Sequence, residues 1–583
     1  MRVKKSKTSN GNLYYIIKTY YDTKGIEHTI TVEKLGNEHD IREKTGRDPD
    51  EWARERAKCL TEKEKEDAKN ITVDFSPTSL ITKNYQYSFN VGYLFLQKIY
   101  HELKLDKICD DIQAGAKFKF NLNDILAKLC YGRILCPSSK IKTYDFSKTL
   151  LEQPEFKQHQ IYRALDVLAE HSDDIQAGLY KNSFALGKRN TKVIYYDCTN
   201  FFYEIEEADV DGLRQYGKSK ENRPLPIVEM GLFTDKDGIP LTMSIHPGNT
   251  NEQVTLRPLE KKLLKDFEMS KFVVCTDAGL SSKANKRFNS LNDRAFITTQ
   301  SLKTLKSELK ETALNPTQWY LMGIKTKYKK YDISQIDEEK FKDAVFYKEV
   351  PVDNNDFYER LIVTYSIKYR NYMRNIRERQ VARAEKALKN GGVRLKKNAN
   401  DFRRFIRKES YTPEGELAEK TRQYIDTEVI ENEAKYDGFY AVSTNLMDDE
   451  PSEIAAINHQ RWQIEQSFRI MKSEFKARPA YVRNESRIEA HFLTCFLSLI
   501  LYKYLEKRLN GNYTCEQITE TLRTMEVREI VGDGYIPTYT RTNLTDSLHE
   551  TFGFRTDYQI VTKANMKKIK SASKKRKLYA KNT

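Results

Sequence analysis

Three strand-like runs follow one another in the middle of this chain, and their order, together with the elements after them, constrains the fold more than any other feature. The runs, rich in β-branched and aromatic residues, are KVIYYD (192–197), PIVEMGLF (226–233) and PLTMSIH (240–246). Next come a helix-like stretch (252–267), a strand KFVVCTD (271–277), a short helical piece (281–288) and a strand AFITTQ (295–300). The order βββαβαβ predicts a mixed α/β sheet that starts as a meander and continues with parallel crossover strands, unlike the uniform alternation of a doubly wound fold.

Several further units are expected around this sheet, because 583 residues exceed what one core holds. Two strand-like runs over 13–35, separated by the turn sequence 22–25, predict a hairpin, and 91–186 shows helical apolar spacing. We expect an N-terminal β-hairpin with a helix (1–75), a helical domain that is a candidate for DNA binding (76–190), the sheet domain (191–300 and 434–480), an insertion in it (301–433) and a helical C-terminal region with a basic, disordered tail (481–583).

The charge of the chain favours a polyanionic partner. Lys and Arg number 99 against 83 Asp and Glu, a net charge of +16, and nucleic acid is the leading candidate. The eight cysteines are scattered without Cys-x-x-Cys spacing, which argues against a disulfide framework and a structural zinc site. The longest apolar stretch, 492–502, is too short to span a bilayer, and no secretory signal follows the basic start, so we expect a cytoplasmic protein without a membrane partner.

Two aspartates stand where strands of the predicted sheet end. Asp197 ends the first strand and Asp277 ends the fourth. Packing explains such carboxylates poorly, because Asp disfavours strands and is costly to bury alone. Asp277, which precedes Ser281, can also be explained as a helix N-cap or turn residue. Two of them in one sheet indicate that a cation is bound there.

A third acid lies in the helix-like stretch INHQRWQIEQSFRIMKSEF, which belongs to a long predicted helix over 453–475. At about 100° per residue, Arg461, Glu465 and Lys472 fall within roughly 40° of one another, with Asn458 close by, beside an apolar stripe that can dock on the sheet. An ordinary surface ion pair between Arg461 and Glu465 remains an alternative. Three carboxylates from two strands and a helix suit two divalent metal ions in phosphodiester chemistry.

These residues resemble the DDE transposases of bacterial insertion sequences. The βββαβαβ order with Asp197, Asp277 and Glu465 resembles their RNase H-like core, and Arg461-x3-Glu465-x6-Lys472 matches the end of the Tyr-x2-Arg-x3-Glu-x6-Lys signature of one branch. The segments YGKSKENRPLPIVEMGL (216–232) and HPGNTNE (246–252) resemble that branch as well. Asn458 stands where the signature has Tyr, which is a departure from the pattern.

The resemblance implies a function and a set of site residues. Asp197, Asp277 and Glu465 are expected to hold two Mg²⁺ or Mn²⁺ ions. Arg461 and Lys472 are expected to contact DNA phosphates. The chain would bind terminal inverted repeats of double-stranded DNA, cleave there as a homodimer in a paired-end complex, and join the freed 3′-OH to target DNA.

Weaker candidates and other functions stay open. Asn458 and the loop residues Lys218, Lys220 and Arg223 are candidate DNA contacts, although a solvated loop explains the loop cations equally well. Two basic helical pieces, 369–389 and 393–408, are expected to serve assembly on DNA or to form solvated faces. The alternatives to a transposase are a catalytically inactive DNA-binding relative and a structure-specific nuclease of RNase H-like fold.

Overall fold

A computed structural model describes the chain except for residues 9–10, 22–26, 68–70, 72, 74, 325–328, 355, 391–400, 412–419 and 577–583. The chain forms two compact units. The first comprises residues 1–87, 528–537 and 557–566, and the second comprises 88–527, 538–556 and 567–583. Each unit is described by itself below.

The first unit contains a three-stranded antiparallel sheet, β1 (Arg2–Thr8), β2 (Gly11–Tyr21) and β3 (Glu27–Asn37), followed by α1 (Glu38–Thr45) and α2 (Pro49–Asp67). Its core is built on Tyr14, Ile41 and Ala53. The predicted hairpin is confirmed as the β2–β3 pair, to which β1 adds a third strand, while the predicted turn 22–25 lies outside the described residues. Short β17 (Gly534–Pro537) pairs with β18 (Val561–Thr562), and β16 (Glu526–Ile530) precedes them.

In the second unit, the residues predicted to be helical from their apolar spacing do form helices. After a short strand, β4 (Ser88–Asn90), these helices are α3 (Tyr93–Glu102), α4 (Leu105–Ala114), α5 (Leu122–Leu135), α6 (Lys140–Ser147), α7 (Gln158–Glu170), α8 (Ser172–Ser183) and η1 (Phe184–Leu186). The break predicted at 136–139 separates α5 from α6, where the Ser139 side chain caps α6 by accepting a hydrogen bond from the Lys142 amide.

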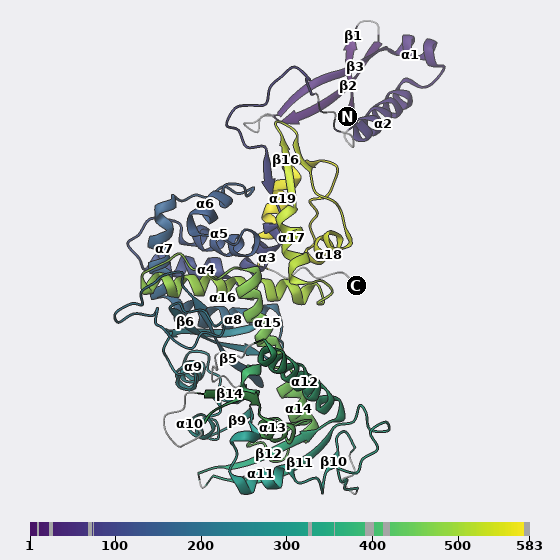
Figure 1. Cartoon of the computed structure of the whole chain (residues 1–583). Helices are drawn as coiled ribbons and strands as arrows, with labels where there is room; N and C mark the ends of the chain where they lie inside the picture. Colours follow the sequence, from purple (N-terminus) through teal and green to yellow (C-terminus); the bar gives the residue numbers. More distant parts are fainter. Residues whose placement is uncertain are drawn as a thin grey trace. The chain divides into compact units, whose positions relative to one another are not determined.

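The long helix α16 (Glu485–Arg508) joins the helical domain to the sheet. It packs against α3, α5 and α7 and against strand β7, and runs between the two layers (Figure 1). This helix is long and apolar enough to cross a membrane by length and composition alone, and 94% of its most apolar part is buried inside the protein, as in a core helix. Beyond it lie α17 (Cys515–Thr524), α18 (Asn543–Phe552) and α19 (Lys563–Ser573). The prediction of a disordered tail is therefore wrong up to Ser573.

The predicted βββαβαβ order is confirmed. Strands β5 (Val193–Phe202), β6 (Ile227–Asp235) and β7 (Pro240–Pro247) form an antiparallel meander, followed by α9 (Glu252–Asp266), β8 (Phe272–Thr276), η2 (Ala278–Leu280), α10 (Lys283–Phe288) and β9 (Arg294–Thr299). Strand β8 lies parallel to both β5 and β9, in the sheet order β7-β6-β5-β8-β9. Helix α9 packs on this sheet through Leu256, Leu259 and Leu263.

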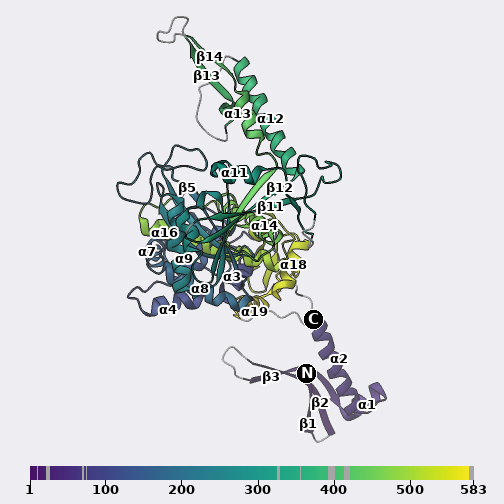
Figure 2. The same cartoon turned by 90° about the horizontal axis from the view of Figure 1, so that it is seen from below.

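The segment between β9 and β15 (Phe439–Thr444) extends the same sheet. After η3 (Leu302–Thr304) and α11 (Ser307–Leu314), strands β10 (Tyr320–Leu321), β11 (Phe346–Asp353) and β12 (Tyr358–Tyr365) continue it in the order β10-β11-β12-β15-β9. Helix α12 (Ile367–Lys389), η4 (Phe402–Phe405), the hairpin β13 (Ile406–Tyr411) and β14 (Lys420–Ile425), and α13 (Thr427–Ala434) project from it together (Figure 2). The helix predicted over 369–389 is thus confirmed.

The helix predicted over 393–408 is wrong where the structure describes it. Residues 391–400 lie outside the described part, and the chain then forms η4 and strand β13. Ile406 is buried opposite Ile425 of β14, so cross-strand burial decides the conformation there. The close spacing of basic residues in this segment, which suggested a helix, does not correspond to an α-helix in the described part of the structure.

The long helix predicted over 453–475 is interrupted. It consists of α14 (Pro451–His459), α15 (Trp462–Arg469) and the π-helical turn η5 (Ile470–Glu474). The Tyr195 hydroxyl donates a hydrogen bond to the Ile457 carbonyl at 3.1 Å, which is the acceptor that the Arg461 amide would use in a continuous helix. The Arg461 amide bonds instead to the Asn458 carbonyl at 3.3 Å. The Ile457 carbonyl also accepts from the Gln460 amide at 3.1 Å, so a tight turn and a hydrogen bond from the sheet coincide at this break.

Candidate active site

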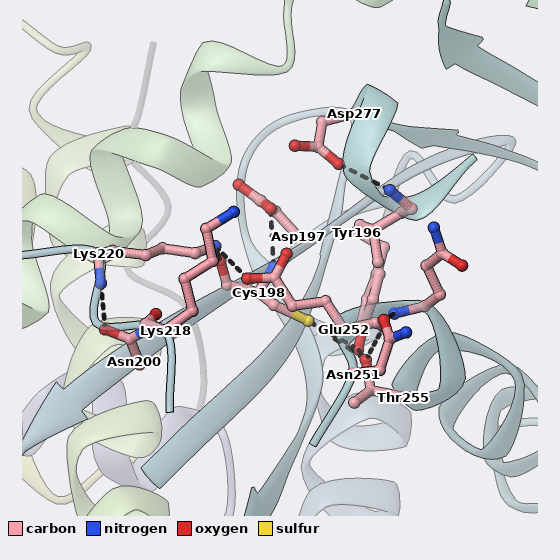
Figure 3. Close-up of polar contacts among 12 residues, drawn as sticks. Tyr196, Asp197, Cys198, Asn200, Lys218, Lys220, Asn251, Glu252, Thr255 and Asp277 are labelled. Atoms are coloured by element: carbon pink, nitrogen blue, oxygen red, sulfur yellow. Dashed lines mark hydrogen bonds and ion pairs between the residues drawn. The ribbon is translucent and has the colours of Figure 1, made fainter. Parts of the chain in front are cut away.

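Asp197 and Asp277 lie at the place where two neighbouring parallel strands separate. The β5–β8 ladder ends at the pair Tyr195 and Cys275, whereas β5 continues beside β6 as far as Phe202. Asp197 is therefore inside β5 rather than at its end, which corrects the prediction. Asp277 follows β8 directly, and the two carboxylates point toward the same space (Figure 3).

The surroundings of the two carboxylates disfavour charge on Asp197. Burial raises the pKa of Asp197 to about 6, and the neighbouring Asp277 adds to the shift, while Lys220 and Arg461 oppose it. One Asp197 oxygen accepts a hydrogen bond from the Cys198 amide at 2.8 Å. Asp277 accepts one from the Leu280 amide at 3.1 Å, so it is also the N-cap that the sequence allowed. A bound cation would relieve the repulsion between these two groups.

Three cationic side chains surround the pair. Lys220 contacts Glu252 at 2.9 Å and donates to the Cys198 carbonyl; burial lowers its pKa, but Asp197 and Glu252 outweigh burial and raise it. Lys472 lies 3.5 Å from Glu221, and burial, assisted by Lys220, lowers its pKa to about 8. The field of Arg461 reaches Asp197. Lys220 and Arg461 act to lower the pKa of Asp197, and Asp197 in turn acts to raise that of Lys472, so all three cations interact with the same carboxylate.

Glu465 lies beside this group rather than within it. Its carboxylate is 54% exposed and 3.8 Å from the Arg461 guanidinium, and it lines a cavity of about 410 Å³ together with Trp462. In the part of the chain that the structure describes, no three His, Cys, Asp or Glu side chains are grouped to hold one metal ion. The structure therefore brings Asp197 and Asp277 together and connects Glu465 to them through Arg461.

Of the remaining candidate DNA contacts, one side chain is buried and two are exposed. Asn458 is 6% exposed and donates to the Tyr440 hydroxyl at 2.8 Å, so little of its side chain is left for DNA. Lys218 is exposed, and its carbonyl accepts a hydrogen bond from the Asn200 side chain at 3.0 Å. Arg223 is exposed too and lies 4.2 Å from the centre of the Phe202 ring.

Two acids near the site were missed by the sequence reasoning. Glu229 of β6 is 3% exposed, and burial together with Glu252 raises its pKa to about 7. Glu252 begins α9 and binds Lys220 at 2.9 Å (Figure 3). The sequence did contain a signal for Glu229: it is the one charged residue in the apolar run PIVEMGLF. A charge buried in such a strand needs a partner.

Two arginines of the predicted assembly helices have partners within the chain. Arg377 of α12 lies 2.6 Å from Asp437, and Arg404 of η4 lies 2.8 Å from Glu433. Arg404 also donates to the Gln380 side chain of α12 at 2.7 Å, so these contacts join η4 to α12 and α13, and α12 to the segment after α13. Both residues therefore have a structural role in addition to any role on DNA.

Close backbone contact explains Gly217, in the loop that carries Lys218 and Lys220, and Gly248, which follows β7 and packs against that loop. A Cβ on Gly217 would lie 1.8 Å from the Gly248 carbonyl oxygen, and a Cβ on Gly248 would lie 2.1 Å from the Ile227 carbonyl oxygen. The Gly248 amide also donates to the Leu213 carbonyl at 3.1 Å. Only glycine fits at these positions without moving the backbone that presents Lys220.

We expect Gly248→Ala to destabilise the protein by about 1–3 kcal/mol, because backbone atoms must move to admit the methyl group. Urea unfolding followed by circular dichroism measures this. Gly115→Ala is the matched control, since its Cβ would meet only the Ile112 carbonyl at 3.9 Å. Equal stability of the two variants would contradict the close packing of this loop.

Residues 210–501, half of the chain, match the model of the protein family described as "Transposase DDE domain". The chain belongs to this family. The match contains Asp277, Arg461, Glu465 and Lys472, and Asp197 lies just before it. Membership of the transposase DDE domain family agrees with the resemblance found in the sequence, at the level of the family rather than of the branch.

Comparisons with other proteins add two similar solved structures to this family assignment. A piggyBac transposase synaptic complex with hairpin DNA shares 8% identity, with a TM-score of 0.35, over 74% of this chain and 78% of that chain. A Mos1 transposase paired-end complex with the left transposon end shares 11% identity, with a TM-score of 0.12, over 39% of this chain and 62% of that chain. No curated protein matches the chain.

Proposed function

We propose that this DDE family transposase acts on an insertion sequence: it binds the terminal inverted repeats, cleaves DNA strands there with divalent metal ions, and joins the freed 3′-OH to target DNA. The observation that carries the proposal is the pair Asp197 and Asp277, which face one space at the end of the β5–β8 ladder. The strand order β7-β6-β5-β8-β9 supports an RNase H-like core around them.

The donor atoms suit Mg²⁺ or Mn²⁺. Asp197 and Asp277 offer hard carboxylate oxygens, and Glu465 would complete the set for two ions by leaving its 3.8 Å contact with Arg461. Such ions, when bound, activate the attacking oxygen and stabilise the leaving oxygen of a phosphodiester. The raised pKa of Asp197 fits a carboxylate that needs a cation nearby in order to ionise.

The cations around the carboxylates would position the DNA. Arg461 and Lys472 lie on different turns of the α15 and η5 segment, and both influence Asp197 electrostatically. A phosphate held by these two side chains would place the scissile bond beside Asp197. Lys220, fixed by Glu252, would keep the Asp197 carboxylate oriented.

We expect Arg461→Ala and Lys472→Ala each to weaken binding of end DNA and to lower the slope of log affinity against log salt by about one, because each removes one phosphate contact. Fluorescence anisotropy at several salt concentrations measures both quantities. Lys507→Ala is the control, since Lys507 is exposed and paired with Asp237 at 2.7 Å. If the two variants lose only thermal stability, Arg461 and Lys472 are structural residues.

The experiment that tests the function uses the full chain and labelled duplexes that carry the DNA flanking its gene. We expect strand cleavage at defined positions with Mg²⁺ or Mn²⁺ and none with EDTA. A homodimer in a paired-end complex predicts a slow band in native gels that contains two differently labelled ends. Cleavage of branched DNA without an end sequence would favour the nuclease alternative, and binding without cleavage would favour the inactive relative.

A further inference from the structure

A cavity of about 560 Å³ opens between the α5–α6 turn and the segment that follows η5. Its lining includes five Lys and Arg side chains, Arg133, Lys140, Lys142, Lys476 and Arg478, and the Ser138 hydroxyl. The described lining residues include no Asp or Glu. All of them belong to the second unit, so the cavity is built within one body. Its lining favours an anionic ligand.

Lys140 is the decisive residue of this cavity. It is 5% exposed, and among the described residues its ammonium group has neither a hydrogen-bond acceptor nor an ion-pair partner. Burial, with the nearby Arg133, lowers its pKa to about 7. An unpaired buried ammonium group is costly to a fold, which makes it a candidate binding group.

Other polar groups of the cavity are also left without partners. The Ser138 hydroxyl and the Arg133 Nε are buried and unpaired among the described residues. The remaining nitrogens of Arg133 donate to the carbonyls of Phe475, at 3.1 Å, and Ser138, at 3.2 Å, and so fix the guanidinium in place. Helix α6 begins here, and its first amides add partial positive charge. These donors form a preorganised anion site.

Arg478 links the cavity to the candidate active site. Arg478, on its wall, is ion-paired with Glu221, and Glu221 also lies 3.5 Å from Lys472. The Arg478 guanidinium is 5.3 Å from the centre of the Phe202 ring of β5, the strand that carries Asp197. A strand of DNA bound across Lys472 would therefore reach the cavity through Arg478.

We infer that this cavity binds a backbone phosphate of the DNA, next to the phosphates at the candidate active site. The inference rests on the proposed function for the identity of the ligand, and on Lys140, Ser138 and Arg133 for the site. Phosphate oxygens satisfy the donors that the protein leaves unpaired, and a net charge of +16 favours a polyanion over a free anion.

Phosphate binding would also change the protonation of Lys140. Its titratable neighbours are Arg133 and Cys130 of α5 and His491 and Cys495 of α16. Burial raises the pKa of both thiols and lowers the pKa of His491, so these three groups are neutral at pH 7. A phosphate would raise the pKa of Lys140 from about 7, so that binding takes up protons near neutral pH and weakens as the pH rises.

The test compares Lys140→Met and Ser138→Ala with the full wild-type chain, on a labelled duplex in EDTA. We expect about tenfold weaker binding for Lys140→Met, a salt slope lower by about one, and a severalfold loss for Ser138→Ala. The matched control is Lys148→Met at the other end of α6, where Lys148 is exposed and lies 3.2 Å from Asp145. Calorimetry in two buffers should show that proton uptake near pH 7 disappears in Lys140→Met.

Separate measurements test whether the variants fold and which ligand the cavity binds. Removal of an unpaired buried charge should leave the Tm of Lys140→Met at or above that of wild type. Wild-type affinity and salt slope in both variants would overturn the inference. If inorganic phosphate binds wild type but not Lys140→Met while duplex affinity is unchanged, the cavity binds free phosphate and not DNA. Because EDTA excludes cleavage, a chain that fails to cut DNA can still pass this test.

Discussion

Asp197→Asn and Asp277→Asn are each expected to reduce metal-dependent cleavage of end DNA by about a thousandfold or more, with little change in the affinity for that DNA. Each substitution keeps the size of the side chain and removes a charged metal ligand, whereas the affinity depends on phosphate contacts elsewhere. Cleavage on denaturing gels and anisotropy with the same duplex measure the two effects.

The stability of Asp197→Asn separates loss of chemistry from loss of fold. Burial raises the pKa of Asp197 to about 6, so the ionised carboxylate destabilises the folded protein at pH 8. In EDTA we therefore expect a higher Tm for Asp197→Asn than for wild type, while Mg²⁺ should raise the Tm of wild type alone. A fully active Asp197→Asn or Asp277→Asn would remove that residue from the proposed site.

Arg189→Leu is expected to destabilise the protein by about 3–5 kcal/mol, because it leaves a buried carboxylate without its partner. Arg189 and Asp235 are 3% and 0% exposed and 2.6 Å apart. The same guanidinium donates to Ser183 at 2.9 Å and to the Ile239 carbonyl at 3.1 Å, so it connects α8 to the β6–β7 turn. Urea unfolding measures the loss.

The neighbouring Lys188→Leu is the control for Arg189→Leu, because Lys188 is exposed and the change should cost little. The double variant Arg189→Leu with Asp235→Leu should recover part of the loss, since it removes the unpaired charge as well. A single variant as stable as wild type would contradict the assignment of this ion pair to the core.

The spacing of apolar residues and the local composition predicted the strands and helices whose formation depends on local burial. The runs 192–197, 226–233 and 240–246 became β5, β6 and β7, because strands buried on both faces, one of them against α9, favour β-branched and aromatic residues. The hydrogen bond of the Tyr195 hydroxyl could not be predicted in this way. This hydroxyl donates a hydrogen bond at the break in the predicted helix, a contact between residues 262 positions apart that no periodicity records.

The candidate site was predictable as residue types but not as geometry. Asp197 and Asp277 were recognisable because a carboxylate in an apolar strand needs a cation. The extension of β5 past Asp197 depends on pairing with β6, and the place of Glu229 beside Glu252 depends on a fold contact. Nothing in the sequence indicated that Lys140 is buried and, among the described residues, unpaired, because a lysine at a helix start is usually solvated.

The most direct test of the proposed site concerns Glu465, the carboxylate that the structure places beside Arg461. The measurement is the Mg²⁺-dependent cleavage rate of end DNA by Glu465→Gln, with Glu474→Gln, in the following η5 turn, as the matched control. If Asp197, Asp277 and Glu465 together hold the catalytic metal ions, Glu465→Gln loses cleavage by a factor similar to Asp277→Asn, and Glu474→Gln cuts at the wild-type rate. Wild-type cleavage by Glu465→Gln would contradict the three-carboxylate site.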